Sequence, residues 1–88
     1  MKEREFEKQL KALANRRRLA IIKYLKSHEE APVAEIAEAI HLSFKATSKH
    51  LAILSSFNVL EREQKNLQMF YRLTGAYSSV TRSVIHLL

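Results

Sequence analysis

The stretch VAEIAEAIHLSFKATSKHLAIL, residues 33–54, decides the fold of this 88-residue chain. Its apolar side chains recur at helical spacing over two short segments, about 33–40 and 44–55, with a turn of three or four residues between them. Pro32 and Ser43 stand where helices commonly begin, because proline lacks an N–H that the first turn leaves unpaired and serine can cap that turn. Two short helices at this spacing are typical of a helix-turn-helix, whose second helix enters the major groove of DNA.

The outward side of the helix at 44–55 has the chemistry of a DNA-reading surface. The helical period places Thr47, Leu51 and Leu54 inward and Lys45, Ser48, Lys49 and Ala52 outward. No Asp or Glu occurs from Leu42 to Leu60. Cations suit phosphates, small polar groups suit base edges, and a carboxylate would repel the DNA backbone. The alternative is an ordinary solvated helix face, which the two lysines alone do not exclude.

Three further residues of this segment are candidates for contact with DNA. Ser43 and the helix N-terminus can point N–H groups at a phosphate. Phe44, at the exposed start of the helix, can contact a thymine methyl group, or it can pack against Phe57 or the preceding helix. His50 lies at the edge of the inward face, where a partly buried, hydrogen-bonded histidine is favoured over a base-reading one.

After Asn58 the apolar period changes from 3.6 to 2, which predicts a β-hairpin from VLEREQ (59–64) and LQMFYRL (67–73) around Lys65-Asn66. Asn66 tolerates the left-handed conformation of a tight turn. The alternation puts Met69, Tyr71 and Leu73 on one face and Gln68, Phe70 and Arg72 on the other. Such a hairpin can act as a wing, with Arg62, Lys65 and Asn66 reaching the minor groove or the phosphates beside it. The alternative is a charged tip that only blunts aggregation.

The remaining segments predict three more helices around this unit. The first, about 3–14, has a stripe of Phe6, Leu10 and Leu13. The second follows Asn15, a candidate N-cap, and its stripe is Leu19, Ile21, Ile22 and Leu25. In its basic run, Arg18 is interpreted as structural, while Arg16 and Arg17 are weaker candidates for phosphate contact. The last, about 75–88, has a stripe of Val80, Val84 and Leu87, flanked by Tyr77 and Leu88. The predicted fold is one mainly α domain over residues 1–88, with about five helices and a two-stranded wing.

Composition narrows the function classes. A net charge of +6 and a pI near 9.9 favour a polyanionic partner, either nucleic acid or an anionic membrane surface. No helix combines a broad apolar face with opposing basic residues, so membrane-surface binding is disfavoured. The absence of cysteine excludes disulfides and thiolate metal sites. No glycine-rich phosphate loop and no nucleophile with a base is present, which argues against an enzyme. Residues 1–10 do not form a signal peptide, so we expect a cytoplasmic protein.

The pattern resembles the ArsR/SmtB-type winged-helix repressors over about residues 6–73. LKALANRRRLAIIKYL (10–25) is similar to the opening of that family, with Asn15 in place of an Asp cap and Arg18-Leu19 matching. AEIAEAIHLSFKATSKHLAIL (34–54) matches its helix-turn-helix pattern, with His41 where a turn glycine is common. VLEREQKNLQMFYRL (59–73) fits its wing. No single piece is decisive, but their order and spacing are specific.

The resemblance implies a homodimer that binds a palindromic operator on double-stranded DNA and represses by occluding a promoter. The first and last helices would form the interface, through Phe6, Leu10, Leu13, Tyr77, Val80, Val84, Leu87 and Leu88. The residues favour this independently, because an exposed apolar helix end on so small a protein needs cover. The alternative is that the last helix packs only on its own core.

Many relatives of that family sense metals, with ligands on two helices. Here the helix at 33–40 offers only Glu35 and Glu38, and the last helix offers only His86. One histidine, even doubled across a dimer, does not make a tetrahedral site. We therefore expect no metal site and no cofactor, and the residues do not point to an inducer. The leading hypothesis is a dimeric, metal-independent repressor. The alternative is a winged-helix protein-interaction module without specific DNA reading, favoured by Phe44 and the missing turn glycine.

Overall fold

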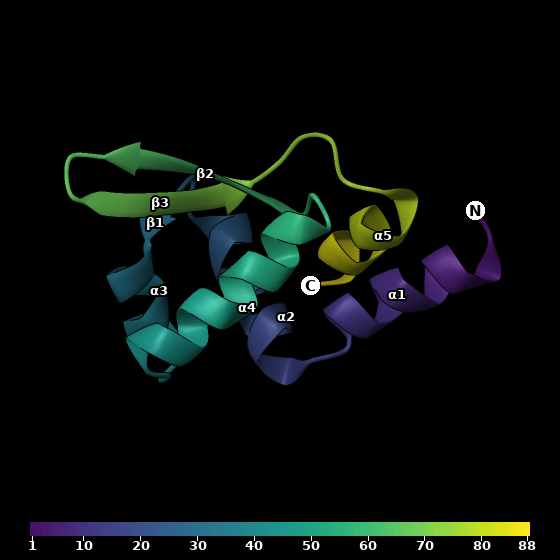
Figure 1. Ribbon diagram of the computed structural model, residues 1–88, viewed down its shortest axis with the longest axis horizontal. Helices are drawn as coiled ribbons and strands as arrows, with labels where there is room; N and C mark the ends of the chain where they lie inside the picture. The colour runs from purple at the N-terminus through teal and green to yellow at the C-terminus, as the bar shows by residue number, and fades with distance from the viewer.

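The computed structural model describes all 88 residues and shows five helices packed below and beside a small sheet (Figure 1). The helices are α1 (Glu3–Leu13), α2 (Arg16–Ser27), α3 (Val33–Ala39), α4 (Phe44–Ser56) and α5 (Ser79–Leu87). The predicted fold class, a winged helix-turn-helix with about five helices, is confirmed. None of the helices has the length and apolar character to cross a membrane.

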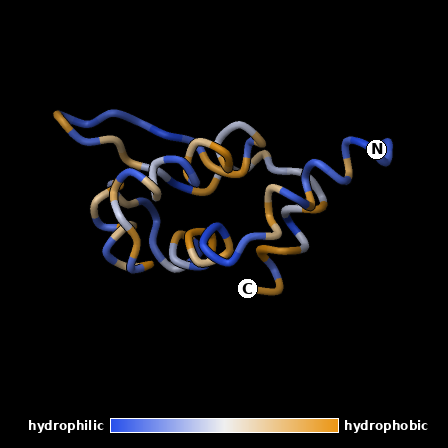
Figure 2. The backbone as a smooth tube through the Cα atoms, turned by 60° about the horizontal axis from the view of Figure 1, so that its bottom comes forward, coloured by the Kyte–Doolittle hydropathy of each residue, from blue (hydrophilic) through white to orange (hydrophobic).

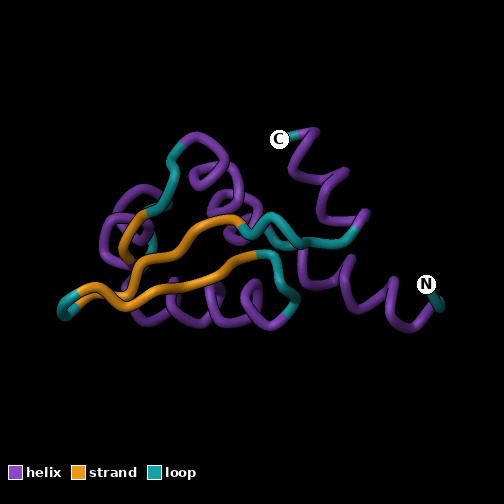
Figure 3. Tube along the Cα trace, turned by 90° about the horizontal axis from the view of Figure 1, so that it is seen from above, coloured by secondary structure: helices purple, strands orange, loops and turns teal.

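The sheet has one strand more than the predicted hairpin. Its strands are β1 (Ala31–Pro32), β2 (Leu60–Lys65) and β3 (Gln68–Leu73), antiparallel and in the order β1-β3-β2 (Figure 3). A two-residue strand has no period that a sequence pattern can reveal, which is why β1 was missed. Pro32 is tolerated there because an edge strand does not need every N–H. It pairs with Phe70 and also precedes α3, which begins at Val33.

The hairpin register places the apolar side of the wing on the helices. Leu60 lies opposite Leu73, and Lys65 opposite Gln68. Tyr71 is buried, with Met69 and Leu73 packed against the core, so the predicted inner face is confirmed. The turn lies one residue later than predicted, because Lys65 still belongs to β2.

Left-handed backbone and side-chain caps mark the local boundaries. Asn66 at the hairpin turn and His41 between α3 and α4 both have φ of 56°. His41 thus adopts the conformation for which glycine is favoured. Asn15 accepts hydrogen bonds from the N–H groups of Arg17 and Arg18, at 3.0 and 3.1 Å, and confirms the predicted cap of α2. Ser43 caps α4 by accepting from the N–H of Ala46 at 3.1 Å.

The core lies between the sheet and α2, α3 and α4. All three predicted inward residues of α4, Thr47, Leu51 and Leu54, are fully buried. Val33, Ile36 and Ala37 of α3 are buried as well, and so is Ile40 directly after it. The helix-turn-helix is therefore held by its own apolar stripe, and its opposite face is left to solvent.

The last helix differs from the prediction in extent and in orientation. It begins at Ser79, after Ser78 as cap, rather than near residue 75. Its buried residues are Thr81 and Ile85, whereas Val80 and Val84 are half-buried and Leu87 is exposed. Val80 and Val84 pack at the edge of the core, and Thr81 and Ile85 enter it, so the exposed part of the predicted stripe is Leu87. Figure 2 shows the hydrophobic end of this helix at the C-terminus, beside α1.

Candidate nucleic-acid interface

The outward face of α4 carries free positive charge. Lys45 and Lys49 are exposed, and neither forms an ion pair with any acidic side chain. Ala52 is exposed beside them, and Ser48 is half-buried. Because no acidic group competes for these ammonium groups, they are available to an external anion.

The wing adds a third free cation next to α4. Arg62 lies opposite Tyr71 in the register and therefore on the sheet face that turns toward the helices. It is exposed and unpaired, and it lines an open groove with Ala52, Ser55 and Ser56 of α4. The fold thus brings Arg62 to the C-terminal half of α4, which the sequence did not show.

Lys65, the second basic residue predicted for the wing, is engaged within the chain. Its ammonium group donates to Glu30, in the loop before β1, and lies 5.1 Å from the centre of the Phe70 ring. Arg72 binds the same carboxylate at 3.3 Å and also binds Glu61 at 2.7 Å. The hydrogen bond from Lys65 is the largest influence on Glu30 and lowers its pKa, and the same bond raises the pKa of Lys65.

The tip of the wing is apolar as well as polar. Asn66 is exposed, and Leu67 is 98% exposed. Phe44, 60% exposed, lines a groove with Leu67 and Met69. The same groove is lined by Val33 and Ala34, so Phe44 faces both the wing and the preceding helix α3. Packing against Phe57 is wrong, because Phe57 lies at the other end of α4. Leu67 was not a candidate in the sequence, where only its place in the turn could have signalled it.

Two arginines at the start of α2 donate hydrogen bonds to carbonyl oxygens at the C-terminal ends of other helices. Arg17 donates to the carbonyl oxygens of Ile40, at 2.6 Å, and His41, at 3.5 Å, where α3 ends. Arg18 donates to the carbonyl of Ala12 through Nε and to that of Lys11 through Nη2, where α1 ends. The structural interpretation of Arg18 is confirmed.

His50 is half-buried and bonded, as the sequence favoured. Its Nδ1 lies 3.1 Å from Nη1 of Arg18. Burial lowers the pKa of His50, and the positive charges of Arg18 and Arg17 lower it further. The imidazole is therefore neutral at physiological pH.

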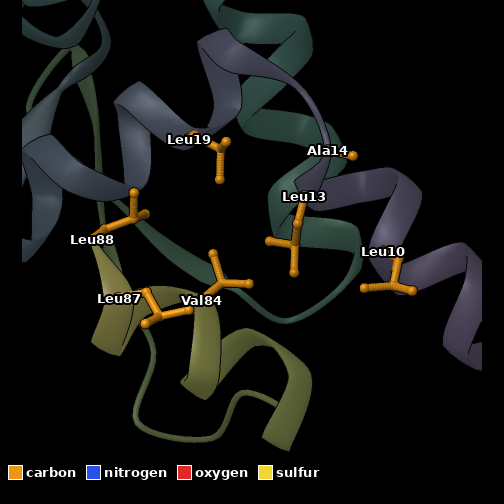
Figure 4. Close-up of a pocket in the computed structure, with 7 residues that line it drawn as sticks. All are labelled: Leu10, Leu13, Ala14, Leu19, Val84, Leu87 and Leu88. Atoms are coloured by element: carbon orange, nitrogen blue, oxygen red, sulfur yellow. The ribbon is translucent and has the colours of Figure 1, made fainter.

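An apolar groove of about 310 Å³ opens between α1, α2 and α5. Side chains from α1 and α5 face one another across it, with Leu19 of α2 at one end (Figure 4). The groove is lined by Leu10, Leu13, Ala14, Leu19, Val84, Leu87 and Leu88. Leu10 is 44% exposed and Leu87 is 85% exposed, whereas Leu13 is buried within the chain.

The other predicted interface residues lie around this groove. Phe6 is exposed, on the turn of α1 that precedes Leu10. Tyr77 and Val80 are half-buried, and Arg82 lies 5.5 Å from the centre of the Tyr77 ring. The structure gathers no three histidine or acidic side chains that could hold a metal ion. Of the two acidic residues of α3, Glu35 accepts a hydrogen bond from Tyr24.

Comparison with known proteins matches this geometry to one family. Residues 15–61 fit the family model described as "Bacterial regulatory protein, arsR family". The chain is 31% identical over 70 residues to the arsenical resistance operon repressor of Bacillus subtilis (strain 168), which covers 80% of this chain and 67% of that protein.

Two solved structures extend the likeness to nearly the whole chain. Reduced HlyU from Vibrio cholerae N16961 is 34% identical, with a TM-score of 0.79 over 98% of this chain and 90% of that one. The homodimeric winged helix-turn-helix DNA-binding domain Mb0332 from Mycobacterium bovis is 28% identical, with a TM-score of 0.76 over 93% and 72%. The chain therefore belongs to the ArsR family of bacterial DNA-binding transcriptional regulators, which are not enzymes.

Proposed function

We propose that the chain is a repressor that binds a palindromic operator as a homodimer and occludes a promoter. The observation that carries the proposal is the outward face of α4, where Lys45 and Lys49 are exposed and unpaired. In this assignment α4 enters the major groove, as the second helix of a helix-turn-helix does.

The other predicted contacts take their roles from their places around α4. Ser43 and the N-terminus of α4 bind a phosphate. Phe44, Ser48 and His50 lie along the side of α4 that faces the major groove of the DNA. Arg62 and Asn66 of the wing bind phosphates or the minor groove beside the site. Lys65 contributes only after it leaves Glu30.

A salt series on duplex DNA tests the assignment. Lys45→Glu combined with Lys49→Glu should abolish binding, since each change replaces a phosphate-binding cation by an anion. The matched control is Lys23→Glu with Lys26→Glu, which makes the same charge change at two exposed, unpaired lysines of α2. Replacing Lys45 and Lys49 by Gln should reduce the salt slope by about 0.9 per lost phosphate contact.

The outcomes separate a local from a general charge effect. Equal losses in the two charge-reversed proteins would show that only net charge matters, and would contradict the role of α4. A wild-type protein that selects no sequence from a random duplex pool would favour the protein-interaction module. A symmetric selected sequence would support both the operator and the dimer.

We also propose that α1 and α5 form the dimer interface through the apolar groove. Leu87 lines the groove and is 85% exposed, so its side chain is shielded from water only when a partner chain covers the groove. Support comes from Mb0332, which is homodimeric with the same fold. Residues 1–88 would then be one DNA-binding domain with dimerisation helices at both ends.

Sedimentation equilibrium tests the interface. Leu87→Glu should produce monomers, because dimerisation would bury an unpaired carboxylate between α1 and α5 of one chain and those of the other. Leu67→Glu is the matched control, since Leu67 is an exposed leucine on the wing, far from the groove in the chain and in the fold. A dimer that persists in Leu87→Glu, or one that is lost in Leu67→Glu, would place the interface elsewhere.

A further inference from the structure

A single guanidinium group joins the end of α1 to the recognition helix α4. Arg18, in the first turn of α2, donates to the carbonyl oxygens of Ala12 and Lys11 and to Nδ1 of His50. The residues it links stand far apart in the sequence, since His50 lies 32 positions after Arg18. Through this side chain, a helix that lines the apolar groove is tied to the helix with the free lysines.

The contact with Arg18 determines which nitrogen of His50 carries the proton. A guanidinium group has only donors, so Nδ1 must accept with a free lone pair. The neutral ring therefore carries its hydrogen on Nε2. Protonation would place a hydrogen on Nδ1 against the Arg18 donor and break the contact.

The charged groups on the elements around α4 leave this pair without an acidic partner. On α2 the groups that act on the ring are Arg18 and Arg17. On α4 itself the charged neighbours are Lys45 and Lys49. The acidic side chains of the other packed elements are engaged elsewhere or lie on other faces, namely Glu7 with Lys11 on α1, Glu35 and Glu38 on α3, and Glu61 and Glu63 on β2. Arg62 of β2 is a further cation and lies at the C-terminal half of α4. Nothing therefore offsets the repulsion that a protonated His50 would feel.

We propose that Arg18 is a positioning residue for DNA binding, which holds His50 as the Nε2–H tautomer and so fixes α4 against the end of α1. The inference rests on the proposed role of α4 in DNA binding. The guanidinium group of Arg18 donates hydrogen bonds to three acceptors within the chain, so in this proposal it contacts no phosphate. The ring presents a hydrogen-bond donor rather than an acceptor at the edge of the DNA-facing side. Operator recognition then depends on the Arg18–His50 contact and not only on the charge of the helix.

The first experiment is a double-mutant cycle of Arg18→Gln and His50→Ala. It measures affinity for a duplex selected by the wild-type protein, and the ratio to a random duplex. Each single change should lower the ratio about tenfold, the order of one charge-assisted hydrogen bond. The double variant should be no worse than His50→Ala, since the two groups act through one contact. Additive losses would overturn the proposal.

A near-isosteric variant tests the ring nitrogen that faces Arg18. Asparagine places an acceptor where Nδ1 stands. His50→Asn should retain the Arg18 contact and keep the ratio closer to wild type than His50→Ala. Equal ratios in His50→Asn and His50→Ala would show that the contact with Arg18 does not position the helix.

The pH profile gives a readout that a purely stabilising arginine would not move. The selected-to-random ratio should fall on acidification as His50 becomes protonated, at a pH below its usual pKa of about 6.5. In Arg18→Gln and in His50→Asn the step should be lost, because Arg18→Gln has no contact for protonation to break and His50→Asn has no ring to protonate. A profile unchanged by these variants would contradict the proposal.

Nitrogen NMR of the free protein tests the tautomer without DNA. The ring of His50 should show an unprotonated Nδ1 and a protonated Nε2, and its titration midpoint should rise in Arg18→Gln. If the wild type binds no DNA but these signals appear, the proposed function fails while the Arg18–His50 contact stands. A protonated Nδ1 at neutral pH would overturn the contact itself.

Discussion

At the residue scale, basic side chains that look alike in the sequence do different things. Lys49 is exposed and free, whereas Lys65 is bound to Glu30. Arg17 closes α3, and Arg18 closes α1. A cation held by an internal partner must give up that contact before it can bind a phosphate, so these residues are not equivalent candidates for DNA binding.

Leucines show the same dependence on position. Leu51 is fully buried in α4, and Leu67 is 98% exposed at the wing tip. Leu51→Ala should lower the free energy of unfolding by about 2–5 kcal/mol, because it removes buried methyl groups and leaves a cavity. Leu67→Ala should change it by less than about 0.5 kcal/mol. Urea unfolding of the two variants checks this, and similar losses would contradict the burial of Leu51.

At the element scale, short helices depend on their caps and the wing depends on its anchor. Asn15 satisfies two N–H groups at the start of α2. Glu30 holds the wing to the loop before β1, through Lys65 and Arg72. Both contacts lie at the ends of elements, where backbone groups or charges lack partners within the element itself.

The cap of α2 can be tested by substitution. Asn15→Ala should lower the free energy of unfolding by about 1 kcal/mol, because two N–H groups lose their acceptor. Asn15→Asp should preserve it, since aspartate caps a helix as well as asparagine does. Thermal unfolding by circular dichroism measures both, and an unchanged midpoint in Asn15→Ala would argue against the cap.

The anchor of the wing predicts a pH dependence. The pKa of Glu30 is lowered in the folded chain, so its contribution to stability is present above the usual pKa and is lost as pH falls through the lowered one. Acidification below about pH 4.5 should therefore increase hydrogen exchange of the wing amides. Glu30→Gln should show raised exchange already at neutral pH, with little further change on acidification. A wing equally protected in both proteins would contradict the anchor.

At the scale of the whole molecule, the candidate DNA-binding cations and the apolar groove lie on different elements. Lys45 and Lys49 lie on α4 and Arg62 lies on the wing, while the apolar groove lies between α1, α2 and α5 (Figure 4). One face therefore suits a polyanion and another suits an apolar partner. A chain of 88 residues gains stability from covering the second, because its own core is small.

The apolar groove, if it is the dimer interface, predicts a melting temperature that depends on protein concentration. If two chains share the groove, unfolding includes dissociation, and the midpoint should rise with concentration. Leu87→Glu should melt at one temperature at all concentrations. Scanning calorimetry over a hundredfold range checks this, and a constant midpoint in the wild type would contradict the dimer.

The sequence alone determined the features that depend on neighbours within a few residues. Helical periods located α3 and α4, Asn15 and Ser43 marked helix starts, and period-2 alternation predicted the wing with its inner face. Each of these is local, because a helix or hairpin repeats within a turn or a pair of residues. The outward lysines of α4 followed from the same period.

Only the tertiary structure decided which side chains are engaged and which are free. Glu30 meets Lys65, and Arg18 meets His50, across 35 and 32 positions of chain. The third strand and the buried face of α5 depend likewise on distant packing. No local pattern encodes such contacts, because they arise when elements far apart in sequence pack together. The candidate surfaces were therefore visible in the sequence, but their charge partners were not.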